Sequence, residues 1–188
     1  MENIEYLEFA KEIAYEAGKI MLKYLNAKDI SSYKGDKTIV TLADKEINTY
    51  LINRVKERFP NHSVDGEEEK FGESNYVWVC DPVDGTAMYA RHIPVAVFSL
   101  ALVVDGESRV GVVYDVFTDT LYSAIKGEGA YKNGENILYV NHGFNNGHKI
   151  KSWCLKEGLK LAHVIKVEPG DNEGISKFYI SLNLKKII

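Results

Sequence analysis

Two aspartates, Asp81 and Asp84, stand three positions apart in the hexapeptide DPVDGT at 81–86. Taken alone, this stretch is compatible with an ordinary turn, because Pro82 favours turns and Gly85 permits a positive φ. It follows a β-prone run, however, and two carboxylates at one strand end repel each other unless a cation lies between them. Mg²⁺ suits that position, since it takes oxygen ligands and often recruits phosphate oxygens.

A second source of carboxylates is the run Glu67, Glu68 and Glu69 in VDGEEEKFG. A run of charges is usually a solvated loop. This one lies one short connection before the β-prone run at 76–81, and a hairpin-like return would bring a glutamate beside Asp81. The pattern therefore favours three converging carboxylates.

The residues after Asp84 favour an anion site. If AMYAR at 87–91 opens a short helix, the backbone amides of Gly85, Thr86 and Ala87 lie at the positive end of its dipole. Carboxylate-bound metal beside such amides describes a phosphate-binding centre. The chemistry expected of it is metal-assisted hydrolysis of a phosphate ester.

Two helices are predicted before these motifs. Apolar residues recur at spacings of three and four from Ile4 to Leu25, which is typical of one buried helix face. The same spacing returns over 42–59, and Pro60 marks the end of that second helix.

After the second helix the pattern is that of β-strands. Strands are predicted over 76–80, 95–104 and 109–116, followed by hairpins at glycine-rich turns that include Asn133-Gly134. The fold class expected is α+β, with two N-terminal helices packed on a mostly antiparallel sheet.

Composition narrows the classes of partner. The net charge of −4 and the absence of a basic stripe argue against nucleic acid. No apolar run approaches the roughly 20 residues that span a membrane, and the first residues are amphipathic and acidic, so a cytoplasmic protein with a small-molecule partner is expected. Cys80 and Cys154 form no C-x-x-C pair, and no histidine shows metal-ligand spacing.

Three stretches together resemble the lithium-sensitive, Mg²⁺-dependent inositol monophosphatase family, which is related to fructose-1,6-bisphosphatases and bisphosphate nucleotidases. They are GEE at 66–68, DPVDGT at 81–86 and GVVYDVFTDTLYSAIKGEGAYKNG at 111–134. The resemblance covers about 4–140. It implies a metal and phosphate domain over 1–141, equivalent to the N-terminal half of the family's sandwich, and an atypical tail over 142–188.

The resemblance also implies a set of metal ligands. Glu67, Asp81 and the Val83 carbonyl would bind a first Mg²⁺, and Asp81 would bridge to a second that Asp84 also binds. Mn²⁺ is an alternative cation, and Li⁺ is expected to inhibit. A loop containing Lys34 and Asp36 resembles the mobile loop that contributes a third metal.

The catalytic residues implied by the resemblance are Thr86, Glu67 and Asp44. The amides of Gly85 and Thr86 would hold the substrate phosphate. Thr86, paired with Asp44, would position the attacking water. The substrate expected is a small phosphorylated metabolite, either an inositol phosphate or a sugar phosphate.

The late sequence departs from the family. The family's second half carries a W-D-x-A-A-G-like motif whose aspartate binds the second metal, whereas Trp153 is followed here by Cys154 and the only late aspartate is Asp171. Two readings follow: a metal-dependent phosphatase with reduced activity, or a catalytically inactive module for metal and phosphate binding or for assembly. An apolar sheet face left uncovered also predicts a homo-oligomer.

Overall fold

The computed structural model describes residues 2–27, 31–33, 39–137, 159–160, 163–165, 180–182 and 185–186. It divides into two compact units, Met1–Lys126 and Gly127–Ile188. The first unit contains α1 (Glu2–Leu25), β1 (Ser31–Tyr33), β2 (Ile39–Thr41), α2 (Leu42–Arg58), β3 (Ser63–Gly66), β4 (Lys70–Phe71), β5 (Tyr76–Asp84), α3 (Thr86–Tyr89), β6 (Val97–Val104), β7 (Glu107–Asp115) and β8 (Thr120–Ile125). The second contains β9 (Gly129–Lys132), β10 (Glu135–Ile137), β11 (Leu159–Lys160), β12 (His163–Ile165), β13 (Ile180–Leu182) and β14 (Lys185–Lys186).

A twisted sheet forms the centre of the first unit, with its strands in the order β8-β7-β6-β5-β3-β4. Neighbouring strands are antiparallel except β3 and β5, which are parallel. β6 and β7 are joined at Asp105-Gly106, where φ is +52° and +79°. Positive φ at both positions suits a two-residue hairpin turn, so the predicted antiparallel pair is confirmed.

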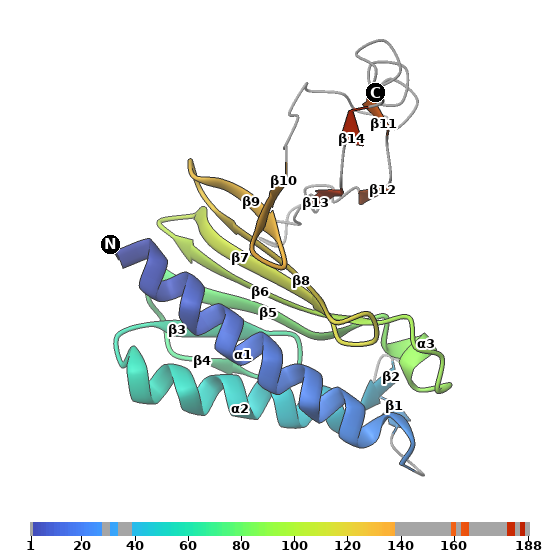
Figure 1. Cartoon of the computed structure of the whole chain (residues 1–188). Coiled ribbons are helices and arrows are strands. Elements are labelled where there is room, and N and C mark those ends of the chain that lie inside the picture. The colour runs from blue at the N-terminus through green and yellow to red at the C-terminus, as the bar shows by residue number, and fades with distance from the viewer. Residues whose placement is uncertain are drawn as a thin grey trace. The chain divides into compact units, whose positions relative to one another are not determined.

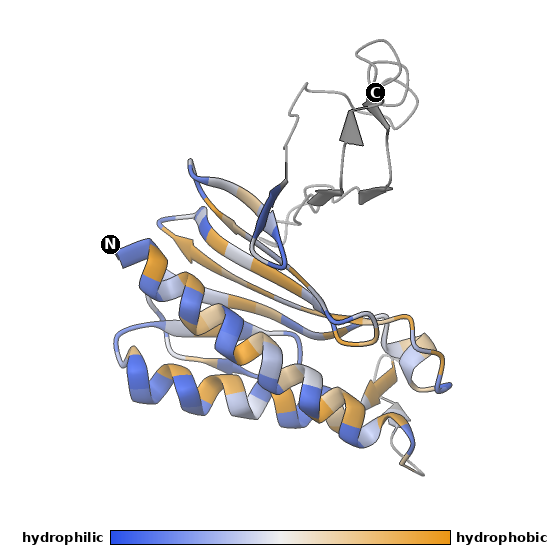
Figure 2. Ribbon diagram, in the orientation of Figure 1, coloured by the Kyte–Doolittle hydropathy of each residue, from blue (hydrophilic) through white to orange (hydrophobic). Residues whose placement is uncertain are grey.

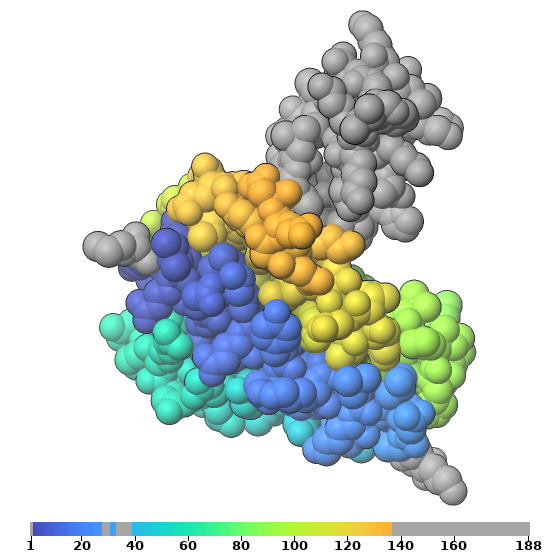
Figure 3. Space-filling model, viewed as in Figure 1, coloured from blue at the N-terminus to red at the C-terminus, as the bar shows by residue number. Residues whose placement is uncertain are grey.

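Both long helices lie along the same face of this sheet (Figure 1). α1 packs on β6, β7 and β8, and α2 packs on β3 and β5. Apolar residues of the strands and of the inner helix faces meet between the layers (Figure 2). The outer surfaces of α1 and α2 adjoin each other in the space-filling view (Figure 3). The predicted α+β class, with two helices on a mostly antiparallel sheet, is confirmed.

Three expectations about these elements need correction. Ile4 was predicted to lie on the buried face of the first helix, but it is 53% exposed because the packed face begins at Tyr6. β5 extends to Asp84 rather than ending at residue 80. The predicted hairpin-like return before β5 is wrong: β3 forms its antiparallel pair with β4, and the chain then crosses to the other side of β3.

In the second unit, β9 and β10 form an antiparallel hairpin. Asn133 and Gly134 connect them with φ of +48° and +82°, which confirms the predicted turn. β11 pairs with β14 and β12 with β13. The predicted boundary between 141 and 142, like Cys154 and Asp171, falls outside the described residues and stays a prediction.

No helix in the described ranges combines the length and the apolar character needed to cross a membrane. The sheet face opposite the helices carries half-buried valines such as Val79, Val103 and Val113, which alternate with core residues. The homo-oligomer expected from the sequence stays a prediction.

An aromatic cluster ties β5 to the start of β3. His62 stacks on Phe59 and Tyr76, with ring centroids 4.9 and 4.8 Å apart. The indole Nε1–H of Trp78 donates a hydrogen bond to His62 Nδ1 over 3.1 Å, which requires that nitrogen to be unprotonated. Burial lowers the pKa of His62, and the charge of Glu2 opposes that shift.

This cluster predicts a loss of stability in mild acid. The pKa of His62 is lower in the folded than in the unfolded protein. The stability that neutral His62 gives to the fold is therefore fully present above the unfolded pKa of about 6.5, and it is lost as the pH falls below that value. We expect the stability advantage of the wild type over His62→Phe to be smaller at pH 5 than at pH 7. Urea unfolding of both proteins at the two pH values measures it; an advantage that does not vary with pH would contradict the assignment.

Candidate metal and phosphate site

Asp81 and Asp84 lie on either side of a β-bulge in β5. Asp81 pairs with Ser99 and Asp84 with Val97, so three steps along β5 face two steps along β6. In a regular strand, side chains three positions apart point to opposite faces of the sheet. The extra residue of the bulge cancels that offset, and the two carboxylates are therefore directed to the same side.

The Asp81 carboxyl group is strongly perturbed by its surroundings. Its Oδ1 is buried and has no hydrogen-bond partner. The pKa of Asp81 is raised from 3.8 to about 8, mainly by burial and also by the charges of Glu67, Asp84 and Asp44 and a hydrogen bond with Glu67. Three other carboxylates therefore act on Asp81, an arrangement that a bound cation relieves.

Glu67 reaches this region through the parallel pairing of β3 and β5. Gly66, the last residue of β3, stands opposite Cys80, and the next backbone N–H, that of Glu67, donates to the Cys80 carbonyl over 3.1 Å. Glu67 is thus beside Asp81, as the sequence predicts, although by a different route. Its side chain is exposed.

Asp44 lies at the start of α2 and is 1% exposed. Its Oδ2 accepts hydrogen bonds from the Thr41 N–H over 2.7 Å and from the Thr41 hydroxyl over 2.5 Å, in a capping box. Burial raises the pKa of Asp44 to about 6, against the lowering effect of those bonds. Thr41 was not predicted from the sequence, although T-x-x-D before a helical pattern resembles a capping box.

Gly85 and Thr86 form the turn from β5 into α3. Gly85 has φ of +101°, and a Cβ at this position would meet the Val95 carbonyl oxygen at 2.7 Å. Only glycine fits there, so no side chain covers the backbone of the turn at this position. The Thr86 hydroxyl donates to the Val83 carbonyl over 2.8 Å, while Asp44 is bonded to Thr41. The predicted pairing of Thr86 with Asp44 stays a prediction.

Side chains of and after α3 anchor this turn to the end of α1. The Tyr89 hydroxyl donates to the Met21 carbonyl over 2.5 Å, and His92 Nδ1 bonds the Leu25 carbonyl. His92 has φ of +60°, a conformation that favours glycine. The bond to α1 gives this histidine a structural role.

The residues present fit a hard divalent cation. The described ranges contain no ready-made set of three His, Cys, Asp or Glu ligands. They do contain Asp81 with an unpaired buried oxygen and three carboxylates acting on its pKa, and oxygen donors of this kind are the ligands that Mg²⁺ takes. Carboxylates that repel each other separate when no cation holds them. Lys34 and Asp36 fall outside the described residues.

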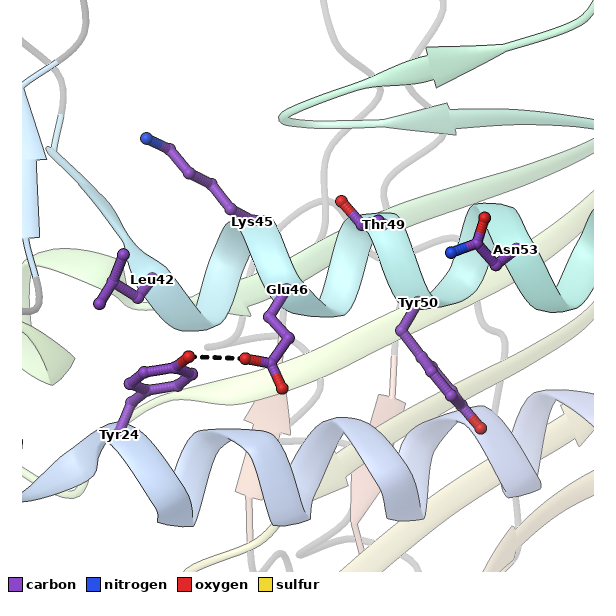
Figure 4. A pocket seen from close by; sticks show the side chains of 7 residues that line it. All are labelled: Tyr24, Leu42, Lys45, Glu46, Thr49, Tyr50 and Asn53. Carbon is purple, nitrogen blue, oxygen red and sulfur yellow. Dashed lines mark hydrogen bonds between the residues drawn. The ribbon is translucent and has the colours of Figure 1, made fainter.

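A separate groove runs between α1 and α2 (Figure 4). A hydrogen bond of 2.6 Å from the Tyr24 hydroxyl to Glu46 crosses it, and Lys23 forms an ion pair with Glu46 over 2.8 Å. None of the predicted site residues lines this groove. The predicted site residues lie instead at the end of β5, at the start of α2 and just after β3.

The chain is similar in sequence and in structure to known inositol monophosphatases. The inositol monophosphatase of Dictyostelium discoideum is 36% identical over 146 residues, which is 73% of this chain and 54% of that protein. The Thermotoga maritima IMPase structure superposes with a TM-score of 0.67 at 29% identity and covers 73% of this chain and 55% of that one. SaIMPase-II bound to inositol monophosphate has a TM-score of 0.61 at 32% identity, with coverage of 73% and 51%.

The chain spans about half the length of the curated relatives it matches. The model of the inositol monophosphatase family matches residues 2–171. That range includes every residue predicted for the site and most of the sequence. The chain therefore belongs to the inositol monophosphatase family.

Proposed function

We propose that this protein hydrolyses a small phosphate monoester with the help of a divalent cation. The observation that carries the proposal is Asp81, whose buried, unpaired Oδ1 is surrounded by the charges of Glu67, Asp84 and Asp44. A strongly raised carboxyl pKa next to other carboxylates is typical of a site that binds metal or moves protons. The family of the chain supports phosphatase chemistry.

Glu67, Asp81, Asp84 and the Val83 carbonyl are the ligands in this proposal. They are all oxygen donors, which favours Mg²⁺, with Mn²⁺ as a close substitute. When bound, the cation activates water, orients the phosphate and stabilises the leaving oxygen. The bulge in β5 serves this purpose, since it directs Asp81 and Asp84 to one side.

Asp44 and Thr86 orient the attacking water. Asp44 Oδ1 is buried without a hydrogen-bond partner, and burial raises the pKa of this carboxyl group to about 6. A base of that pKa is well matched to proton transfer near neutral pH. Hydrolysis joins the water oxygen to phosphorus and breaks the bond to the ester oxygen, which takes up a proton and leaves as an alcohol.

The backbone at Gly85 and Thr86 holds the phosphate. The first amides of a helix have no acceptor within the helix, so those at the start of α3 are suited to phosphate oxygens. Gly85 keeps side-chain atoms away from the turn. Residues with this arrangement bind the group common to all phosphate esters and do not select the alcohol.

The substrate class proposed is an inositol phosphate or a sugar phosphate. SaIMPase-II, which is 32% identical, has been crystallised with inositol monophosphate and with 2′AMP. The second candidate function is a module that binds metal and phosphate without turnover. The observation that favours it is the late sequence, in which Trp153 is followed by Cys154 and not by an aspartate.

Phosphate release tests the proposal. The full chain should release phosphate from inositol 1-phosphate or fructose 1,6-bisphosphate in Mg²⁺ and not in EDTA. A nucleotide 2′-phosphate serves as a third substrate, because the alcohol released from it is a nucleoside. Absence of metal-dependent release from all three, with phosphate binding still seen by calorimetry, would favour the non-catalytic module instead.

A further inference from the structure

Asn48 is a buried polar residue that no predicted role uses. It lies on α2 and is 0% exposed. It follows Asp44 by four positions, so both side chains project from the same face of the helix. A fully buried amide has to satisfy its hydrogen bonds inside the protein, and the partners of Asn48 identify what it does.

All the partners of Asn48 lie in the segment that presents Glu67. Asn48 Oδ1 accepts hydrogen bonds from the Glu68 N–H over 3.2 Å and from the Glu69 N–H over 3.3 Å. Asn48 Nδ2 donates to the Glu69 carbonyl over 3.0 Å. A short side chain with one acceptor oxygen and an NH₂ group satisfies two donors and one acceptor of the loop at once.

The same segment is held from its other side by β5. The Glu67 N–H donates to the Cys80 carbonyl over 3.1 Å, one residue before Asp81. Gly66 fits tightly against Asn48, because a Cβ on Gly66 would meet Asn48 Oδ1 at 2.1 Å. Glu67 is therefore fixed between two supports, the strand that carries Asp81 and the helix that carries Asp44.

We propose that Asn48 is a positioning residue that holds Glu67 in place to bind the metal. It acts through the backbone of Glu68 and Glu69 and does not touch metal or substrate. Since α2 also carries Asp44, one rigid helix sets the places of both acidic groups. This inference rests on the proposed function for the identity of the ligand, and it goes beyond it by assigning a residue outside the ligand set.

The test is metal affinity, measured without substrate. Mn²⁺ is titrated into the full chain and followed by its electron paramagnetic resonance signal, at a temperature where each variant is folded. Asn48→Ala should weaken Mn²⁺ binding by about 10–100-fold, the usual loss when a partner behind a metal ligand is removed. Ile52→Ala, a buried change one turn further along α2, should lower the unfolding temperature at least as much and leave Mn²⁺ affinity within about twofold.

Gly66→Ala disturbs the contact between Asn48 and the loop from the side of the loop. Its new Cβ displaces the Asn48 amide, so Mn²⁺ affinity should fall here too. In the Asn48→Ala background the same change should cost less than in the wild type, because the clash with Asn48 Oδ1 is gone and only the approach to the Glu69 carbonyl oxygen at 2.8 Å remains. Additive losses from the two changes would contradict the proposal.

Hydrogen exchange tests the proposal in the wild type alone, without any variant. The Glu68 and Glu69 amides should be protected although their loop lies at the surface, and rapid exchange at both would overturn the proposal. Unchanged Mn²⁺ affinity in folded Asn48→Ala would overturn it as well. A wild type that binds Mn²⁺ but releases no phosphate would contradict the proposed function alone, whereas one that binds no Mn²⁺ would contradict both.

Discussion

Asp81→Asn should make the metal-free protein more stable at pH 8 while it abolishes metal binding. The pKa of Asp81 is raised from 3.8 to about 8 in the folded state. The metal-free wild type therefore keeps its full stability below the unfolded pKa of Asp81 and loses stability as the pH rises towards about 8. A change of one in pKa corresponds to about 1.4 kcal/mol, and after allowance for partial solvent access we expect a gain of about 2–4 kcal/mol at pH 8.

Urea unfolding in EDTA at pH 5 and pH 8 measures this effect. The advantage of Asp81→Asn over the wild type should grow between the two pH values. Asp105→Asn, the same change in an exposed turn, should stay within about 0.5 kcal/mol of the wild type at both. Saturating Mg²⁺ should then stabilise the wild type and not Asp81→Asn. An Asp81→Asn protein less stable than the wild type at pH 8 would mean that Asp81 does not carry unfavourable charge.

Glu67→Gln should lower metal-dependent phosphate release by about 100-fold or more. The amide keeps the shape of the side chain but removes the charge that holds a divalent cation. Loss of groups that only support metal ligands already costs about 10–100-fold, so loss of a ligand charge should cost at least that much. Initial rates at a fixed Mg²⁺ concentration, with the substrate that the wild type turns over best, measure the effect.

Glu69→Gln is the matched control, since it makes the same change two positions later on an exposed side chain. Its rate should stay within about threefold of the wild type, because Asn48 bonds the backbone of Glu69 and not its carboxylate. Equal losses in both variants would mean that the charge of the whole run, and not the position of Glu67, supports the reaction.

Local patterns in the sequence were sufficient to predict the two long helices and the strands from β5 to β10. The spacing of three and four over 42–59 gives α2 directly, and the Asp105-Gly106 turn identifies the hairpin of β6 and β7. β3 was missed because SVDG is short and half polar, and its partner β5 is parallel and separated from it by β4. Pairing of that kind depends on contacts between segments, which periodicity within one segment does not encode.

The candidate site was predicted in its residue types more than in its geometry. The D-P-x-D spacing indicates two carboxylates, but a strand without interruption would place Asp81 and Asp84 on opposite faces. Pro82 is the signal for the bulge, since proline within a sheet is confined to edges, strand starts and bulges. Asn48 carries no local signal beyond its spacing from Asp44, because all its partners are on another element.

In the proposed function, Asp81, Asp84 and Glu67 hold a divalent cation that supports the hydrolysis of phosphate esters. Phosphate release from inositol 1-phosphate, followed across a Mg²⁺ titration for the wild type and Asp84→Asn, tests it most directly. We predict release by the wild type that rises with Mg²⁺ to a plateau, is abolished by EDTA and falls by at least about 100-fold in Asp84→Asn. Release that is independent of Mg²⁺, or equal in the two proteins, would contradict the claim.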